Sequence, residues 1–264
     1  WNSGSVEPVD DVGMMDGTLT LKRTRKVKEG ANTHTLLITR SGEDLSIASV
    51  VSNDKGDQLS SGTGKGHRLP ALPARPDISK VSFGEPVRLI HNSGLEGWKA
   101  REDTTSSWSV QEGILSNRVS HEKGKRGYNL QTKAAFEDFR LTTEVRILEK
   151  SNSGIYLRGV YEIQIINSHG KPVDSHNMGA LYSRITPLVS AEKPFGEWQT
   201  LDITLVDHHV TVVLNGQMLI DNQPALGCTG GALTWDDSQP GPIMLQGDHS
   251  DIDYRNMVIY PVKK

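Results

Sequence analysis

The sequence predicts an all-β protein whose larger part is a two-sheet sandwich of the jelly-roll kind. Three observations support this prediction. Short apolar or alternating runs recur along the 264 residues, Gly, Asn, Asp and Pro interrupt them, and long helical periodicity is nearly absent. About ten or more strands with this spacing are typical of a double-layered sheet. Hydrophobic residues make up 35% of the chain, which is enough to fill the core of a globular domain.

Residues 1–69 predict a small antiparallel β module. Turn residues at 41–42 and 54–56 separate short strands that alternate in polarity. So few residues leave a thin core, and the chain opens abruptly at Trp1, so we expect further strands upstream of that residue. The expected strands of this module are residues 17–22, 35–40, 45–51 and 62–69.

The next segment, residues 70–79, predicts a linker. It contains Pro70, Pro73 and Pro76, and prolines this dense favour an extended, semi-rigid chain. This segment is the clearest domain boundary in the sequence, and it places the second domain at residues 80–264.

Residues 80–264 predict the sandwich itself. Its clearest strand is 138–147, where Phe139, Leu141 and Val145 share one face and polar residues alternate with them. The pair Asn215-Gly216 joins two apolar runs and can supply the two positive φ angles of a type I′ hairpin turn. The other expected strands are 86–90, 95–98, 153–158, 161–167, 202–205, 242–246 and 252–260, with a hairpin over 108–115 that turns at 112–113.

The composition excludes several classes of function. The formal net charge is −3, and we interpret the one basic cluster, residues 22–28, as a solvated strand end, so we expect no nucleic-acid partner. No apolar stretch is long enough to predict a membrane span. Cys228 is the single cysteine, which excludes an intrachain disulfide and a cysteine-rich zinc site. Asp236 and Asp237 lie in a glycine-rich loop without the alternating acidic ladder of a calcium loop, so we expect no metal and no cofactor.

The segment 153–167 carries the most informative polar side chains. Alternation through the two halves of the segment places Tyr156, Arg158, Glu162 and Gln164 on one sheet face. An aromatic ring, a fixed cation, a carboxylate and an amide are the groups that bind a sugar ring and its hydroxyls. The alternative interpretation is an exposed strand face on which Arg158 and Glu162 form a surface ion pair.

The same segment also limits the mechanism. Retaining β-glucanases of the jelly-roll class carry the pattern Glu-x-Asp-x-x-Glu on one strand, where the two outer carboxylates do the chemistry. Here the corresponding residues are Glu162, Gln164 and Asn167, so only the first is ionisable. The segment therefore cannot support a two-carboxylate mechanism by itself.

Two histidines are further candidates. His176 lies in the loop 174–182, and His249 follows the expected strand 242–246. Loops at strand ends are common places for functional residues, and a histidine can give or take a proton near neutral pH. The alternative interpretation, which fits most single histidines, is a hydrogen-bonded surface residue.

The ordered motifs along the second domain resemble one known family. The motifs on which this resemblance rests are 152–159 (NSGIYLRG), 161–164 (YEIQ), 179–182 (GALY), 196–198 (GEW), 214–216 (LNG), 241–246 (GPIMLQ) and 254–256 (YRN). Over residues 81–262 the chain resembles the 3-keto-disaccharide hydrolase domain family, formerly domain of unknown function 1080. The resemblance implies a concanavalin-like sandwich, a periplasmic or cell-surface location after export, and cleavage of glycosides already oxidised at sugar C3.

The resemblance also implies a site with one essential base. A 3-ketone acidifies the C2 proton, so a base can remove that proton and expel the C1 aglycone, after which water adds. We assign Glu162 as this base and Arg158 as the electrostatic stabiliser, with His249 as a proton relay. The substrate-binding residues that complete the expected site are Tyr156, Gln164, His176, Tyr182, Gln246 and Asp248.

Three other functions fit the sequence. A non-catalytic carbohydrate-binding module would share the fold and the polar face. A conventional glycosidase would take its second carboxylate from Asp248 or Asp236 and would cleave unoxidised glycosides. A structural or adhesive domain would use Arg158 and Glu162 only as an ion pair.

Overall fold

The computed structural model describes residues 6–67, 71–99, 107–120 and 127–263. The chain divides into two compact units, residues 7–71 and residues 1–6 with 72–264. Residues 68–70, at the end of the expected module and the start of the expected linker, lie outside the described residues. Within the described residues, no helix has the length and apolar character needed to cross a membrane.

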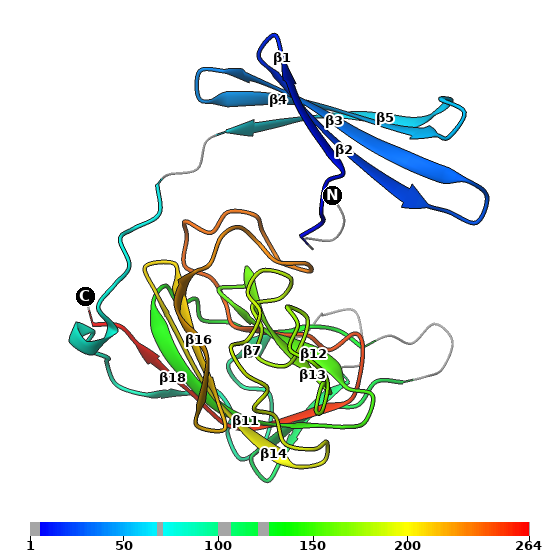
Figure 1. Cartoon of the computed structure of the whole chain (residues 1–264). Helices are drawn as coiled ribbons and strands as arrows, with labels where there is room; N and C mark the ends of the chain where they lie inside the picture. The colour runs from blue at the N-terminus through cyan, green and yellow to red at the C-terminus, as the bar shows by residue number, and fades with distance from the viewer. Residues whose placement is uncertain (1–5, 68–70, 100–106, 121–126, 264) are drawn as a thin grey trace. The chain divides into compact units, whose positions relative to one another are not determined.

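The smaller unit is a single antiparallel sheet in which the strands pair in sequence order (Figure 1). None of its described side chains is buried, because one sheet offers no second layer to cover either face. The first strand was not predicted. Both of its methionines, Met14 and Met15, are largely exposed (70% and 76%), so the strand has no buried face and no alternation of apolar and polar residues that would predict one. The five strands are β1 (Asp11–Met15), β2 (Thr18–Lys26), β3 (Ala31–Ser41), β4 (Asp44–Asn53) and β5 (Gln58–His67).

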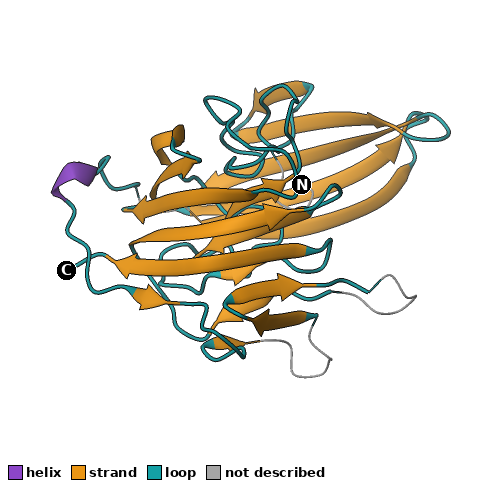
Figure 2. Ribbon diagram, turned by 90° about the horizontal axis from the view of Figure 1, so that it is seen from below, coloured by secondary structure: helices purple, strands orange, loops and turns teal. Residues whose placement is uncertain are grey.

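The larger unit is a sandwich of two antiparallel sheets, which confirms the predicted fold class. Strands make up most of its regular structure, and the short helical turn η1 (Ile78–Lys80) precedes them (Figure 2). The smaller sheet has the order β13-β12-β17-β10-β7, and the larger has the order β16-β15-β14-β11-β18-β9-β8 with β6 paired to β18. The strands of the smaller sheet are β7 (Trp98–Lys99), β10 (Leu130–Thr132), β12 (Asn152–Leu157), β13 (Tyr161–Ile166) and β17 (Met244–Leu245). The strands of the larger sheet are β6 (Val87–Arg88), β8 (Trp108–Gln111), β9 (Ile114–Asn117), β11 (Phe139–Ile147), β14 (Trp198–Val206), β15 (His209–Leu214), β16 (Gln217–Pro224) and β18 (Ile252–Pro261).

The core lies between these two sheets. In β11 the burial alternates as the sequence predicts, with Phe139, Leu141 and Val145 fully buried. Both sheets contribute to one apolar cluster, because alternate residues of each strand face the opposite sheet. Members from the smaller sheet are Trp98, Leu130, Ile155, Leu157, Tyr161, Ile163, Ile165 and Leu245.

Two predicted tight turns fix the register of their hairpins. Asn215 and Gly216 have φ angles of 51° and 80°, and they join β15 to β16. Glu112 and Gly113 have φ angles of 51° and 74° and join β8 to β9. Both pairs therefore have the two positive φ angles that a type I′ turn requires.

Candidate functional site

Three neighbouring strands present polar side chains on the face of the smaller sheet that points away from the core. In β12 and β13, Tyr156 pairs directly with Glu162, and Gly154 pairs with Gln164. On the other side of β12, the backbone N–H of Gln246 donates to the carbonyl of Gly154 over 2.9 Å. Directly paired residues project to the same face, so these side chains form rows across the sheet.

A cleft of about 480 Å³ lies over these rows. It brings together eight of the nine predicted site residues, namely Tyr156, Glu162, Gln164, His176, Tyr182, Gln246, Asp248 and His249. Five more residues line the cleft and were not predicted: an amide just before β10, an amide on β12, an aliphatic residue on β13 and two loop glycines. These are Asn129, Asn152, Ile166, Gly230 and Gly231.

The structure places Arg158 outside the lining of this cleft. The strand β12 ends at Leu157, and Arg158 adopts a left-handed backbone (φ 57°) in the turn to β13, so the alternation that predicted its position stops one residue earlier. Arg158 is 3% exposed, and its guanidinium donates to the carbonyl oxygens of Asp237 and Gln239. Arg158 therefore anchors a loop, and its assignment as the electrostatic stabiliser needs correction.

That loop, residues 226–241, forms one side of the cleft and is bound to the β12–β13 hairpin at several points. The hydroxyl of Tyr156 donates to the carbonyl of Gly230 over 2.6 Å, and the hydroxyl of Tyr161 donates to the Asp237 carboxylate over 2.6 Å. Thr229 accepts a hydrogen bond from the backbone N–H of Glu162 over 2.9 Å. The loop is thus attached at the same hairpin that carries Glu162.

Glu162 is the buried carboxyl of the cleft, and it is only 3% exposed. Burial raises its pKa to about 7, since an ionised carboxylate loses its hydration there. The nearby Tyr156 hydroxyl lowers this pKa and the charge of Asp248 raises it, and both effects are smaller than that of burial. Near neutral pH the group can therefore exist in both protonation states, as a general base or acid requires.

Gly154 makes room for this carboxyl. A Cβ atom at position 154 would lie 2.8 Å from Cγ of Glu162 and would overlap its Oε1. The carboxyl therefore leans across β12 and occupies the space that the glycine leaves open.

We expect Gly154→Ala to displace the Glu162 carboxyl and to lower kcat/KM on the substrate of the cleft by about 10²-fold, because a misplacement of about 1 Å can have this effect. The melting temperature should change little, since the displaced group ends in a flexible side chain. Steady-state kinetics and thermal unfolding check this result. Gly13→Ala, where an added Cβ meets nothing within 4 Å, is the matched control. Unchanged kinetics of the Gly154 variant would contradict the expected role.

Each of the two cleft histidines is paired with a nearby carboxylate. Nδ1 of His249 lies 2.5 Å from Oδ1 of Asp248, and Nδ1 of His176 lies 2.7 Å from Oδ1 of Asp174. A carboxylate at Nδ1 orients the ring and leaves Nε2 as the nitrogen that can exchange a proton. His176 also packs edge-to-face on Tyr182, with ring centroids 5.0 Å apart.

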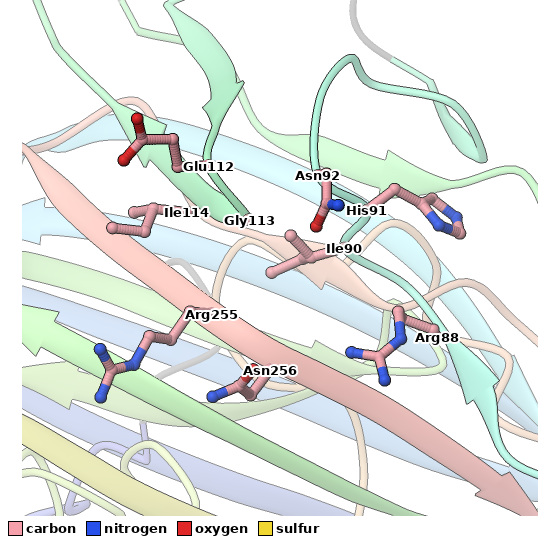
Figure 3. Close-up of a pocket in the computed structure, with 9 residues that line it drawn as sticks. All are labelled: Arg88, Ile90, His91, Asn92, Glu112, Gly113, Ile114, Arg255 and Asn256. Carbon is pink, nitrogen blue, oxygen red and sulfur yellow. The ribbon is translucent and has the colours of Figure 1, made fainter.

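A larger hollow of about 690 Å³ lies on the other sheet, but it lacks the features of an active site. Figure 3 shows Arg88, His91 and Arg255 around it. Arg255 is already paired with Glu144 through two contacts of 2.9 Å, and its guanidinium stacks on Trp198. The lining of this hollow contains no buried carboxyl group. The smaller cleft is therefore the better candidate for an active site despite its lower volume.

Comparison with known families identifies the family of this chain. The family described as 3-keto-alpha-glucoside-1,2-lyase-like domain matches residues 85–260, which is well over half of the chain. The chain belongs to this family. The matched range contains the whole lining of the cleft. No match was found among curated proteins.

Solved structures support the same relationship for this 3-keto-alpha-glucoside-1,2-lyase-like chain. A candidate glycosyl hydrolase from Parabacteroides distasonis is 26% identical, with a TM-score of 0.54 over 74% of this chain and 93% of the other. A second one from the same organism is 19% identical, with a TM-score of 0.55 over 67% of this chain and 94% of the other. The first structure is similar in sequence and fold, and the second shows the shared fold alone.

The metal-binding capacity of this lyase-like domain is limited in the described part of the chain. There, no group of three or more His, Cys, Asp or Glu side chains is arranged to hold a metal ion. Asp236, which the sequence analysis weighed for calcium, accepts hydrogen bonds from the backbone and the hydroxyl of Ser238.

Proposed function

We propose that the protein cleaves glycosides oxidised at C3 by elimination across C1 and C2, with Glu162 as the general base. The observation that carries this proposal is the single buried carboxyl with a pKa of about 7 in a polar cleft. Membership of a family described by 1,2-lyase chemistry supports the reaction type. Elimination needs one base, whereas conventional glycoside hydrolysis needs two carboxyl groups.

The reaction can be followed by its protons and electrons. Glu162 takes the proton from C2, and the electron pair of that C–H bond forms an enolate with the C3 ketone. The enolate then collapses to a C1–C2 double bond, and the bond from C1 to the aglycone oxygen breaks with its electron pair. Water can afterwards add to the double bond and complete a net hydrolysis.

Two further roles follow from the positions in the cleft. The departing aglycone oxygen needs a proton, and Nε2 of His249 or His176 can supply one because Asp248 or Asp174 binds Nδ1 and leaves Nε2 available. With Arg158 engaged by the loop 226–241, the enolate oxygen is stabilised instead by these histidines or by cleft amides as hydrogen-bond donors.

A conventional glycosidase is the second candidate, because Asp248 lines the same cleft and raises the pKa of Glu162. Such an enzyme would use Glu162 and Asp248 as its carboxyl pair. Its activity would extend to unoxidised glycosides.

Incubation with the 3-keto and unoxidised forms of a nitrophenyl glucoside separates the candidates. Release of nitrophenol from the keto form alone is the expected result, together with uptake of solvent deuterium at C2 in deuterated water. Release from the unoxidised form would favour the glycosidase. Binding of either form without release would favour a carbohydrate-binding module and would overturn the proposal.

The rate should follow the ionisation of Glu162. Since the base acts in its charged form, kcat/KM is expected to rise about tenfold per pH unit below pH 7 and to level off above it. Tyr156→Phe should move the midpoint of this rise to higher pH, because the nearby Tyr156 hydroxyl lowers the pKa of Glu162. Rates corrected for uncatalysed elimination at each pH provide the measurement, and a profile flat from pH 5 to 9 would count against this base.

The location of the protein is a separate proposal. The resemblance to exported sandwich domains supports a periplasmic or cell-surface position. Fractionation of cells that express the natural full-length gene tests it, and recovery of the protein only with cytoplasmic markers would refute it.

A further inference from the structure

Two buried amide oxygens in the cleft have no hydrogen-bond partner. Among the described residues, the unpartnered buried side-chain polar atoms are Oε1 of Gln164, Oε1 of Gln246 and Oδ1 of Asn222. Two of these three atoms line the same cleft. Buried polar groups in folded proteins nearly always have partners, so two orphans in one cleft point to a ligand that supplies the missing donors.

These two glutamines belong to one row of the sheet. Gln164 pairs with Gly154 on one side, and the backbone of Gln246 bonds to Gly154 on the other. The three residues therefore lie side by side on β13, β12 and the end of β17, and strand spacing puts the two outer backbones about 10 Å apart. Because Gly154 has no side chain, the row has a gap at its centre.

The carboxyl of Glu162 fills this central gap, since it lies where a Cβ atom of residue 154 would be. The general base is thus placed between the two glutamines. A substrate carbon that gives its proton to Glu162 must lie above the same gap, with one glutamine on each side of it.

The neighbouring asparagine amides do not donate hydrogen bonds to the two unpartnered glutamine oxygens. Asn152 accepts a hydrogen bond from Nε2 of Gln164 over 3.4 Å, which uses the other end of that amide. Asn129 directs its Nδ2 to the sulfur of Met244 at 3.7 Å and accepts from the backbone of Gly247 at 3.0 Å. The missing donors must therefore come from the ligand.

We infer that Gln164 and Gln246 form a two-point hydroxyl subsite that holds two sugar hydroxyls on either side of the carbon deprotonated by Glu162. This inference rests on the proposed function. A carbonyl oxygen accepts hydrogen bonds only, so its partner must be an O–H group. The ketone at C3 and the glycosidic oxygen carry no hydrogen, which leaves the hydroxyls at C2, C4 and C6 of a 3-keto-glucoside. The subsite uses two of these three.

The test is a binding experiment on the slow variant Glu162→Gln. Calorimetry measures the affinity of methyl 3-keto-glucoside and of its 2-deoxy, 4-deoxy and 6-deoxy analogues. Two of the three analogues are expected to bind about 10- to 100-fold more weakly than the parent, as the loss of one hydrogen bond to a buried group predicts. Equal binding of all three analogues and the parent would overturn the inference without any further variant.

Second-site variants assign each hydroxyl to its glutamine. In the Glu162→Gln background, Gln164→Met should make one of the two weakly binding analogues bind as tightly as the parent glycoside. Gln246→Met in the same background should do this for the other analogue. Gln223→Met, at an exposed glutamine that bonds to a main-chain carbonyl, is the matched control and should leave all affinities unchanged. Discrimination that persists in both cleft variants would also overturn the inference.

The outcome separates this inference from the proposed function. If the wild type cleaves the keto form but the deoxy analogues bind equally, only the hydroxyl subsite fails. If the discrimination is found and no cleavage occurs, only the proposed reaction fails. If no glycoside binds at all, both fail.

Discussion

Glu162→Gln is expected to lower kcat/KM for a 3-keto-glucoside by about 10²- to 10⁴-fold, the usual contribution of a positioned general base. Glutamine keeps the size and shape of the side chain, so it still fills the space above Gly154. It cannot accept the C2 proton, and the elimination loses its first step. Initial rates of aglycone release at pH 8, where most of the wild-type Glu162 is ionised, measure the effect.

Two matched variants show whether that loss of activity comes from removal of the general base. Glu197→Gln changes an exposed glutamate outside the cleft and should keep full activity. Asp248→Asn should reduce the rate less than Glu162→Gln, because elimination has no second essential carboxylate. Equal losses at both cleft positions would favour the two-carboxylate glycosidase, and a fully active Glu162→Gln would refute the base assignment.

The same substitution is expected to stabilise the fold at alkaline pH by about 3 kcal/mol. The pKa of Glu162 is about 7 in the folded protein, above the ordinary pKa of 4.5 that the group has in the unfolded chain. The folded state therefore binds the proton more tightly, and wild-type stability decreases as pH rises from about 4.5 through 7. Each pKa unit corresponds to about 1.4 kcal/mol, and Glu162→Gln removes the whole of this decrease.

Chemical denaturation of both proteins at pH 4.5 and pH 9 tests this expectation. The difference in unfolding free energy between the two proteins should grow by about 3 kcal/mol between these pH values. A constant difference would show that Glu162 is better hydrated than its burial indicates. A variant that is less active yet more stable also excludes unfolding as the cause of its inactivity.

Much of the sandwich and the floor of its cleft follows from local sequence patterns. Alternation in 138–147 and the Asn215-Gly216 pair predict a strand and a turn that the structure contains, because each depends on neighbouring residues only. Tyr156, Glu162 and Gln164 could likewise be placed on one face, since they lie on two adjacent strands joined by a short turn.

The errors arise where position depends on distant residues. Arg158 seemed to continue the alternation of β12, but the turn redirects it toward carbonyl oxygens about 80 positions later in the chain. Asn129 lies beside the predicted residues only through the pairing of β10, β17 and β12, which no local pattern reveals. Asn152 lies on β12 itself, where alternation puts it on the same face as Tyr156. The strand β1 is exposed throughout, so it has no hydrophobic periodicity to detect.

The way in which the loop 226–241 is held has an evolutionary consequence. Arg158, Tyr156 and Arg184 all bind the loop through main-chain carbonyls, those of residues 237 and 239, 230 and 228 respectively. Every amino acid has such a carbonyl, so substitutions in the loop leave these attachments intact, whereas the bonds from Tyr161 and from the Glu162 backbone depend on two loop side chains, those of Asp237 and Thr229. Mutation can therefore vary the side chains beside the cleft while the base and its surroundings stay fixed, which allows the preference for the aglycone to diverge among descendants without loss of the reaction.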